Sequence, residues 1–219
     1  MMTQEEAQKA YEEAMRRAQA EQVAHQLLLS KMQRDAAQRQ AMIDDEPRQQ
    51  YAIIAAVDLA GGFGKDGKIP WDFPEDFRWF QSQTKGNICV MGRTTYNEIN
   101  EKLDDAGKDS VLPGRKCFVV SSTLNQADVP NATVIRDIYE VDKHLDDDDI
   151  TKTVFYIGGL HIFSQALPRA DRVLITAINN DYSCDRFFPT DSLNKLFKVN
   201  RVFKSEHTND LRFVEFVRK

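Results

Sequence analysis

The hydrophobic pattern of this 219-residue chain changes near residue 50. Residues 3–43 contain neither glycine nor proline and are dominated by Ala, Gln, Glu and Arg, which favour helices. From Tyr51 onward, short apolar runs alternate with helix-like segments, as in a sheet whose strands are joined by helices. The pattern therefore predicts an α/β domain over residues 48–219, preceded by a helical extension over residues 1–47.

The extension leaves two interpretations open. Its apolar residues fall only partly on one stripe of a helix, and the heptad is interrupted. They are Tyr11, Met15, Val23, Leu27, Leu28 and Met32. Residues 3–43 form either a helix that associates with itself or with a protein partner, or a solvated and partly frayed extension, because isolated helices are marginally stable. The acidic stretch 44–47 ends in Pro47 and marks the boundary.

Eight apolar runs are expected to form the strands of one sheet. They are residues 51–58, 87–91, 116–121, 133–135, 153–157, 172–178, 198–204 and 212–217. No helix separates the last two runs, so these strands are expected to be antiparallel and the sheet to be mixed. Residues 104–109 and 146–149 are acidic and are expected to be solvated loops without chemistry.

Composition excludes several classes of protein. The net charge of −5 and the pI near 5.5, without a long basic run, argue against a general nucleic-acid binder. No apolar stretch is long enough for a membrane span, and the N-terminus resembles neither a signal nor a transit peptide. Cys89, Cys117 and Cys184 follow no metal-binding spacing. We expect reduced thiols, a cytoplasmic protein and no metal.

One carboxylate lies among aromatic residues at the start of a predicted helix. Pro74 suits the first helical turn, and Asp76 shares a helix face with Trp79 and Phe80. An arbitrary aspartate in this position usually complements the helix dipole. A carboxylate on an apolar face is costly, however, and such groups often serve a function. Asp76 is therefore a candidate functional residue.

Three further segments carry glycines or anion-binding groups. The motif Gly92-Arg93-Thr94-Thr95 follows a predicted strand and opens a helix, where backbone N–H groups, hydroxyls and a guanidinium can bind a phosphate. Gly158-Gly159 also lies between a strand and a helix, although such a pair alone can be a simple turn. Residues 61–69 contain four glycines, a composition that fits a lid.

Seven segments occur in the order and spacing of the dihydrofolate reductase family, which residues 51–219 resemble. They are Ile54-Ala55-Ala56, residues 61–71, residues 74–80, residues 91–95, Leu112-Pro113-Gly114-Arg115, Ile157-Gly158-Gly159 and Phe188-Pro189. The resemblance implies a mixed eight-stranded sheet flanked by helices. It also implies hydride transfer from NADPH that reduces 7,8-dihydrofolate to tetrahydrofolate, supporting thymidylate and purine synthesis.

The resemblance assigns roles around the substrate. Asp76 would orient the pterin and favour its protonation at N5, and Trp71 would reach the pterin through water. Arg115 matches the arginine that pairs with the α-carboxylate of the substrate's glutamate. The remaining substrate-binding candidates are Ile54, Ala55, Phe80, Ile99, Ile157 and Thr176. For Ile54 and Ile157, ordinary core packing is an equal alternative.

The resemblance also assigns the cofactor site and the lid. Arg93 with Ser122 would bind the 2′-phosphate and favour NADPH over NADH. The full set of cofactor-binding candidates is Ala56, Gly64, Ile69, Gly92, Arg93, Thr94, Thr95, Ser121, Ser122, Ile157, Gly158, Gly159, Leu160, His161 and Phe163. Family members typically join the glycine pair by a cis peptide. The lid would include Gly61, Gly62, Gly67 and Asp185, whose carboxylate would hold it closed; a plain turn aspartate is the alternative.

The sequence departs from the family pattern in several places. Phe163 stands where a tyrosine is common, Glu98 replaces a small polar residue, and residues 99–112 are longer than in compact members. Methotrexate and trimethoprim-type antifolates are expected ligands. Two alternative functions remain open. One is a reductase of another pteridine or a pyrimidine, which would lack the Pro-x-Asp segment. The other is a non-catalytic assembly protein that keeps the fold.

Overall fold

The computed structural model divides the chain into two compact units, Met1–Pro47 and Arg48–Lys219. It describes residues 15–16, 19, 21–23, 25–37, 48–101 and 110–219. The described residues before Ala37 are helical, and Val23, Leu27, Leu28 and Met32 are exposed. Tyr11, the boundary at 44–47 and the stretch 102–109 lie outside the described residues. Among those described, no helix is long and apolar enough to cross a bilayer.

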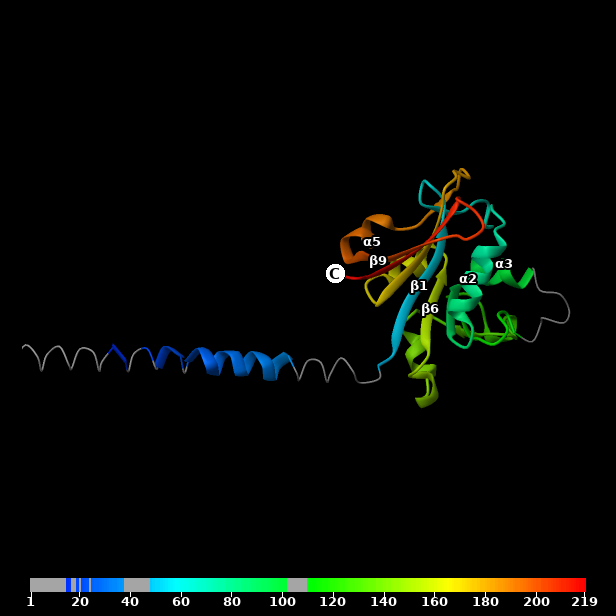
Figure 1. The fold of residues 1–219 in the computed structure, drawn as a ribbon. Helices are drawn as coiled ribbons and strands as arrows, with labels where there is room; N and C mark the ends of the chain where they lie inside the picture. Colours follow the sequence, from blue (N-terminus) through cyan, green and yellow to red (C-terminus); the bar gives the residue numbers. More distant parts are fainter. Residues whose placement is uncertain (1–14, 17–18, 20, 24, 38–47, 102–109) are drawn as a thin grey trace, which may run out of the picture. The chain divides into compact units, whose positions relative to one another are not determined.

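The second unit is built on an eight-stranded mixed sheet (Figure 1). Its strand order is β5-β4-β3-β6-β1-β7-β10-β9. The strands are β1 (Gln50–Val57), β3 (Ile88–Gly92), β4 (Lys116–Val120), β5 (Thr133–Ile135), β6 (Thr153–Gly158), β7 (Arg172–Ile178), β9 (Phe197–Lys204) and β10 (Leu211–Arg218). The chain moves outward from β3 to β5, returns to place β6 between β3 and β1, and continues to β7. This reversal creates a switch point, where open α/β sheets commonly bind ligands.

All eight expected strands are present, with bounds that differ by at most one residue from the sequence prediction. Strands β1, β3, β4, β5, β6 and β7 pair in parallel, whereas β10 is antiparallel to both β7 and β9. The expected mixed sheet and the antiparallel final pair are therefore confirmed. Central parallel strands are buried on both faces, which is why their sequences read as continuous apolar runs.

Helices cover both faces of the sheet. Figure 1 shows α2 (Pro74–Thr84) and α3 (Arg93–Glu101) on one side and α5 (Thr190–Leu196) on the other. Trp79, Phe80 and Ile99 of the first pair pack against a buried cluster that includes Ile54. Helices α4 (Leu160–Ala166) and α5 pack against a second cluster. Short 3-10 helices occupy the connections: η2 (Gln126–Asp128), η3 (Glu140–His144) and η4 (Asp147–Asp149).

A second, two-stranded sheet was not predicted. It pairs β2 (Gly62–Gly64) with β8 (Arg186–Phe187) and thereby joins the glycine-rich segment to a distant loop. Beyond β2, Lys65 and Lys68 exchange two backbone hydrogen bonds of 2.9 Å around a tight turn. Asp66 (φ 52°) and Gly67 (φ 77°) lie in the left-handed region that such a hairpin turn requires. The candidate lid is thus a short hairpin.

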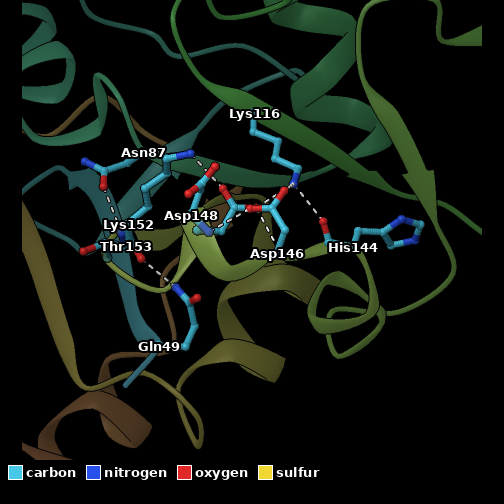
Figure 2. Close-up of polar contacts among 9 residues, drawn as sticks. Gln49, Asn87, Lys116, His144, Asp146, Asp148, Lys152 and Thr153 are labelled. Carbon is cyan, nitrogen blue, oxygen red and sulfur yellow. Dashed lines mark hydrogen bonds and ion pairs between the residues drawn. The ribbon is translucent and has the colours of Figure 1, made fainter. Parts of the chain in front are cut away.

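The amino ends of the strands are tied together by a polar network (Figure 2). Asp149 accepts hydrogen bonds from the ammonium groups of Lys116 at 2.6 Å and Lys152 at 2.8 Å. Nearby, Asn87 Oδ1 accepts the Thr153 N–H at 2.8 Å. Asp149 is only 1% exposed, so the expectation that residues 146–149 are a solvated loop is wrong at this position. One of these lysines begins a strand and the other directly precedes a strand. Their ammonium groups compensate the buried charge of Asp149.

Candidate functional site

A cavity of about 530 Å³ opens at the carboxyl ends of the parallel strands. Strands β1, β3, β4 and β6 each contribute residues from this end to its wall. All fifteen residues that the family resemblance assigns to the cofactor line the cavity. The structure therefore gathers one contiguous site from segments that are more than a hundred residues apart in the sequence.

Arg93 begins α3 directly after β3 and lies at the rim of the cavity. Its Nη1 donates to the Thr123 hydroxyl at 3.0 Å, which directs the guanidinium toward the end of β4. The Ser121 hydroxyl is buried and accepts the N–H groups of Thr123 and Leu124 at 3.3 and 3.1 Å. Ser122 is exposed. Within the serine pair, Ser122 is thus better placed to meet an anion, while Ser121 also shapes the turn.

Sequence reasoning missed a second guanidinium at this rim. Arg136 follows β5 and lines the cavity. Its Nη1 donates to the carbonyl oxygens of Ser121 at 2.6 Å and Leu124 at 2.8 Å. The available signal was its place directly after a predicted strand, at the same edge as Arg93. Other lining residues that were not predicted as cofactor or substrate ligands are Phe63, Gly67, Lys68, Glu98, Val120, Thr123, Ile162, Gln165 and Arg186.

Gly158 and Gly159 lie where β6 ends and α4 begins, and a cis peptide joins them. Gly158 has φ +125°, which disfavours any side chain. A Cβ built there would approach the Phe163 ring at 3.3 Å and the Thr95 hydroxyl at 3.4 Å. The glycine pair therefore lets the backbone line the cavity close to the Thr95 hydroxyl. Together with two arginines and several hydroxyls, this cradle offers the kinds of group that bind phosphate anions.

The lid hairpin is fastened to the loop before β8. The Asp66 N–H donates to Asp185 Oδ2 at 3.0 Å, and the Asp185 N–H donates to the Gly64 carbonyl at 3.0 Å. Gly62 packs so closely on Cys184 that an added Cβ would lie 2.3 Å from the cysteine Cβ. Gly61 adopts φ +82° at the hairpin's base. These contacts place Asp185 and the lid glycines in one unit beside the cavity.

Asp58 anchors the base of this unit and was missed from the sequence. Its buried carboxylate accepts the N–H groups of Ala60 at 3.0 Å, Gly62 at 2.7 Å and Tyr182 at 3.2 Å. Burial alone would raise the pKa of Asp58, but these hydrogen bonds and one from Cys184 outweigh it and lower the pKa. The Tyr182 contact spans 124 residues, so no local sequence signal reveals it.

Asp76 lies near the start of α2 and is half-buried. Burial raises the pKa of its carboxyl group, and a hydrogen bond with the side chain of Thr176 on β7 partly offsets the rise. Thr176 is itself 1% exposed. Two residues that were predicted separately as substrate ligands are therefore brought together, one from α2 and one from β7. A carboxylate in such a setting binds strongly to N–H donors that enter beside it, because water competes poorly there.

Trp71 packs against the same small buried cluster as Trp79 of α2, the helix that carries Asp76. Its ring packs against Tyr182 at a centroid distance of 5.3 Å and also lines the cavity. The indole Nε1 is buried and has no hydrogen-bond partner among the described residues. Buried N–H groups are nearly always paired with protein, water or ligand. This donor can therefore serve a water or ligand atom.

The other substrate candidates divide between two places. Ala55 and Ile157 line the cavity, whereas Ile54, Phe80 and Ile99 pack in the adjacent cluster beneath α2 and α3. Asp76, Arg115 and Thr176 also lie outside the cavity wall. Arg115 stands over the Phe80 ring at 5.8 Å and donates from Nε to the Thr84 hydroxyl at 2.9 Å. Ile157 lines the cavity and also packs against the cluster beneath α2 and α3, so it links the two places.

Phe163 replaces the family's frequent tyrosine within an aromatic cluster. Its ring contacts Phe63 at 5.3 Å and Phe188 at 5.0 Å between centroids, and it is 2% exposed. An unpaired hydroxyl would be costly in such apolar surroundings. Within the described part of the chain, no group of three His, Cys, Asp or Glu side chains could hold a metal ion. Cys89, Cys117 and Cys184 are free and buried.

Comparison with known proteins identifies the family. A family model described as dihydrofolate reductase matches residues 50–218. Dihydrofolate reductase of Haemophilus influenzae is 30% identical over 77% of this chain and 99% of its own length. The Bacillus subtilis enzyme is 31% identical over 77% of this chain and 94% of its own length.

A solved structure shares the fold. The dihydrofolate reductase of Enterococcus faecalis, complexed with NADP(H) and a compound named RAB-propyl, superimposes with a TM-score of 0.66 at 22% identity. The match covers 78% of this chain and 96% of that structure. The family model matches most of the chain, and these comparisons identify the same family as the sequence motifs. The chain belongs to the dihydrofolate reductase family.

Proposed function

We propose that residues 48–219 form a catalytic domain that reduces 7,8-dihydrofolate to 5,6,7,8-tetrahydrofolate with NADPH. The observation that carries the proposal is the continuity of two sites. Ile157 lines the glycine- and arginine-lined cavity and also packs in the same cluster as Phe80 of α2, the helix that carries the half-buried Asp76. One site fits a dinucleotide phosphate, and the other offers a carboxylate to a flat heterocycle. Family membership supports this NADPH-dependent enzyme activity.

The cofactor's role is to supply hydride to the pterin. Residues of this chain would hold it: Arg93, Ser122 and Arg136 at the 2′-phosphate, and the backbone at Gly92 and Gly158-Gly159 along the diphosphate. Only NADPH carries the 2′-phosphate, and this negatively charged group would lie beside two guanidinium groups. The site would therefore favour NADPH over NADH. The hairpin 61–69 would cover the reacting end and exclude water.

Asp76 would position the pterin by accepting two of its N–H groups, as carboxylates do in bidentate pairs. Its negative charge would favour protonation of the pterin at N5, with the proton supplied by water. The indole Nε1 of Trp71 would bind that water or another near the ring. Arg115, over Phe80, would attract the carboxylate of the substrate's glutamate tail. Asp76 thus acts on the substrate's protonation state and forms no covalent bond.

Antifolates such as methotrexate and trimethoprim-type inhibitors belong to the same proposal, because their diamino rings offer N–H donors to a buried carboxylate. The support is Asp76, whose surroundings favour such donors. A cytoplasmic location is proposed as well, and three free cysteines are consistent with a reducing compartment.

The test is to follow NADPH oxidation after addition of dihydrofolate, with NADH and methotrexate as parallel reactions. We expect turnover that prefers NADPH and is inhibited by methotrexate. NADPH binding without turnover would point to another pteridine or a pyrimidine as substrate. If the chain neither binds NADPH nor turns over dihydrofolate, the result would favour a non-catalytic assembly protein.

A further inference from the structure

The lid hairpin is held at two points by carboxylates from different parts of the fold. On one side, Asp185 accepts the Asp66 N–H at 3.0 Å. On the other, Glu98 Oε1 accepts the Ile69 N–H at 3.1 Å. Glu98 belongs to α3, the helix that begins at Arg93. Asp66 lies inside the turn that Lys65 and Lys68 close, and Ile69 directly follows this turn, so the two acceptors hold two different points of one hairpin.

The Glu98 contact lies at the border of the cofactor cavity. Ile69, Glu98 and the hairpin residues Gly67 and Lys68 all line it. Ile69 is 49% exposed, so apolar burial contributes little to holding this end of the hairpin. A hydrogen bond to an ionised acceptor is stronger than one between neutral groups. The contact also spans 29 residues and joins the lid to the phosphate-binding helix.

We propose that Glu98 is a positioning residue that clasps the lid over the cofactor by binding the Ile69 amide. The inference rests on the proposed function, because it assumes that the cavity holds NADPH. Release of cofactor past Ile69 requires the Glu98 bond to break, whereas the Asp185 bond holds a different point of the hairpin. The carboxylate therefore slows cofactor exchange and couples lid closure to the helix that binds phosphate.

Two variants separate this role from general structure. Glu98→Ala removes the acceptor, while Glu98→Gln keeps a carbonyl oxygen that can accept the same N–H without a charge. Glu101→Gln provides a matched control, since Glu101 is an exposed glutamate three residues further along α3. Glu98 is only partly buried, so these changes are expected to leave the fold intact.

The measurements are amide exchange by NMR and the NADPH dissociation rate by fluorescence, both on the full chain. In Glu98→Ala we expect faster exchange at Ile69, unchanged exchange at Asp66, and NADPH release accelerated about three- to tenfold, the effect of one modest hydrogen bond. Glu98→Gln should recover part of both effects, and Glu101→Gln should match the unmodified chain.

If the amide exchange rate of Ile69 is unchanged in Glu98→Ala, the proposed contact between Glu98 and the lid is wrong. Unchanged NADPH release, with faster Ile69 exchange, would overturn the positioning role. Failure of the unmodified chain to bind NADPH would contradict the proposed function instead, and the exchange measurement would still decide whether the clasp exists.

Discussion

The two ends of the parallel sheet use their polar residues in opposite ways. At the amino end, Asp149 accepts hydrogen bonds from Lys116 and Lys152, so its charge is compensated within the chain. At the carboxyl end, Arg93 and the Gly158-Gly159 backbone line an open cavity. Groups that bind each other stabilise the fold, whereas groups that face a cavity can bind a ligand. Substitutions at the two ends should therefore affect different properties.

Asp76→Asn should have the largest effect on activity. Asparagine keeps the shape but removes the charge that favours pterin protonation, so we expect turnover near neutral pH to fall about 10²- to 10⁴-fold. NADPH affinity should stay nearly unchanged, because Asp76 lies outside the cavity wall. Steady-state kinetics and fluorescence titration measure the two quantities. Equal rates for both proteins would contradict the assigned role.

The same variant should not lose stability. The pKa of Asp76 is raised by burial, so the stability associated with this group is present at low pH and is lost as the pH rises through its folded pKa. At neutral pH the buried charge is therefore unfavourable, and asparagine removes it. Thermal unfolding of Asp76→Asn at neutral pH should show an unchanged or higher Tm.

Gly158→Ala should reduce NADPH affinity about ten- to a hundredfold. The new Cβ would meet Phe163 and Thr95 and would occupy the cradle, and the residue's φ of +125° disfavours alanine. Gly86→Ala is the control, since Gly86 also has a positive φ, +76°, yet nothing lies within 4 Å of a Cβ there. Both variants should lose about 1 kcal/mol of stability from backbone strain. Comparable NADPH affinity in the two would argue against the cradle.

Asp149→Asn should lower stability and leave turnover unchanged. Burial would raise the pKa of Asp149, but hydrogen bonds from Lys116 and Lys152 lower it from 3.8 to about 2. Its contribution to stability is therefore present above pH 3.8 and is lost as the pH falls toward about 2. Both lysine side chains are 38% exposed, so solvent screening reduces the expected loss at neutral pH to about 1–2 kcal/mol.

Urea unfolding at neutral pH and near pH 2 measures this contribution. The difference between Asp149→Asn and the unmodified chain should shrink at the lower pH. A large loss of NADPH turnover with normal stability would contradict the division between the two ends of the sheet.

Sequence patterns predicted the strands better than the contacts around the lid. The central strands are buried on both faces, so each appears as an apolar run whose limits can be read directly. Strands β2 and β8 are too short and too polar or glycine-rich for this signal. Pairing between them depends on contacts such as that of Asp58 with Tyr182, which no local pattern encodes.

The same distinction applies to the site. Arg93 and Gly158 could be identified because each lies within two residues of the end of a predicted strand, at the edge where parallel sheets bind ligands. Glu98 was noticed only as a departure from the family pattern, and its partner Ile69 lies 29 residues away. Asp149 was read as solvated because four aspartates in a row usually are. Its buried charge is compensated by Lys116, which begins β4 and is 33 residues away in the sequence.

Removal of residues 1–47 should have the smallest effect on turnover. Every residue that lines the cofactor cavity belongs to residues 48–219, as do all the candidate substrate ligands. The shortened chain should therefore keep its kcat and NADPH affinity. Sedimentation of both forms tests the remaining role of the extension: a mass change beyond that of the removed residues would assign it to association. A large loss of activity in a folded, shortened chain would show that the extension contributes to the site.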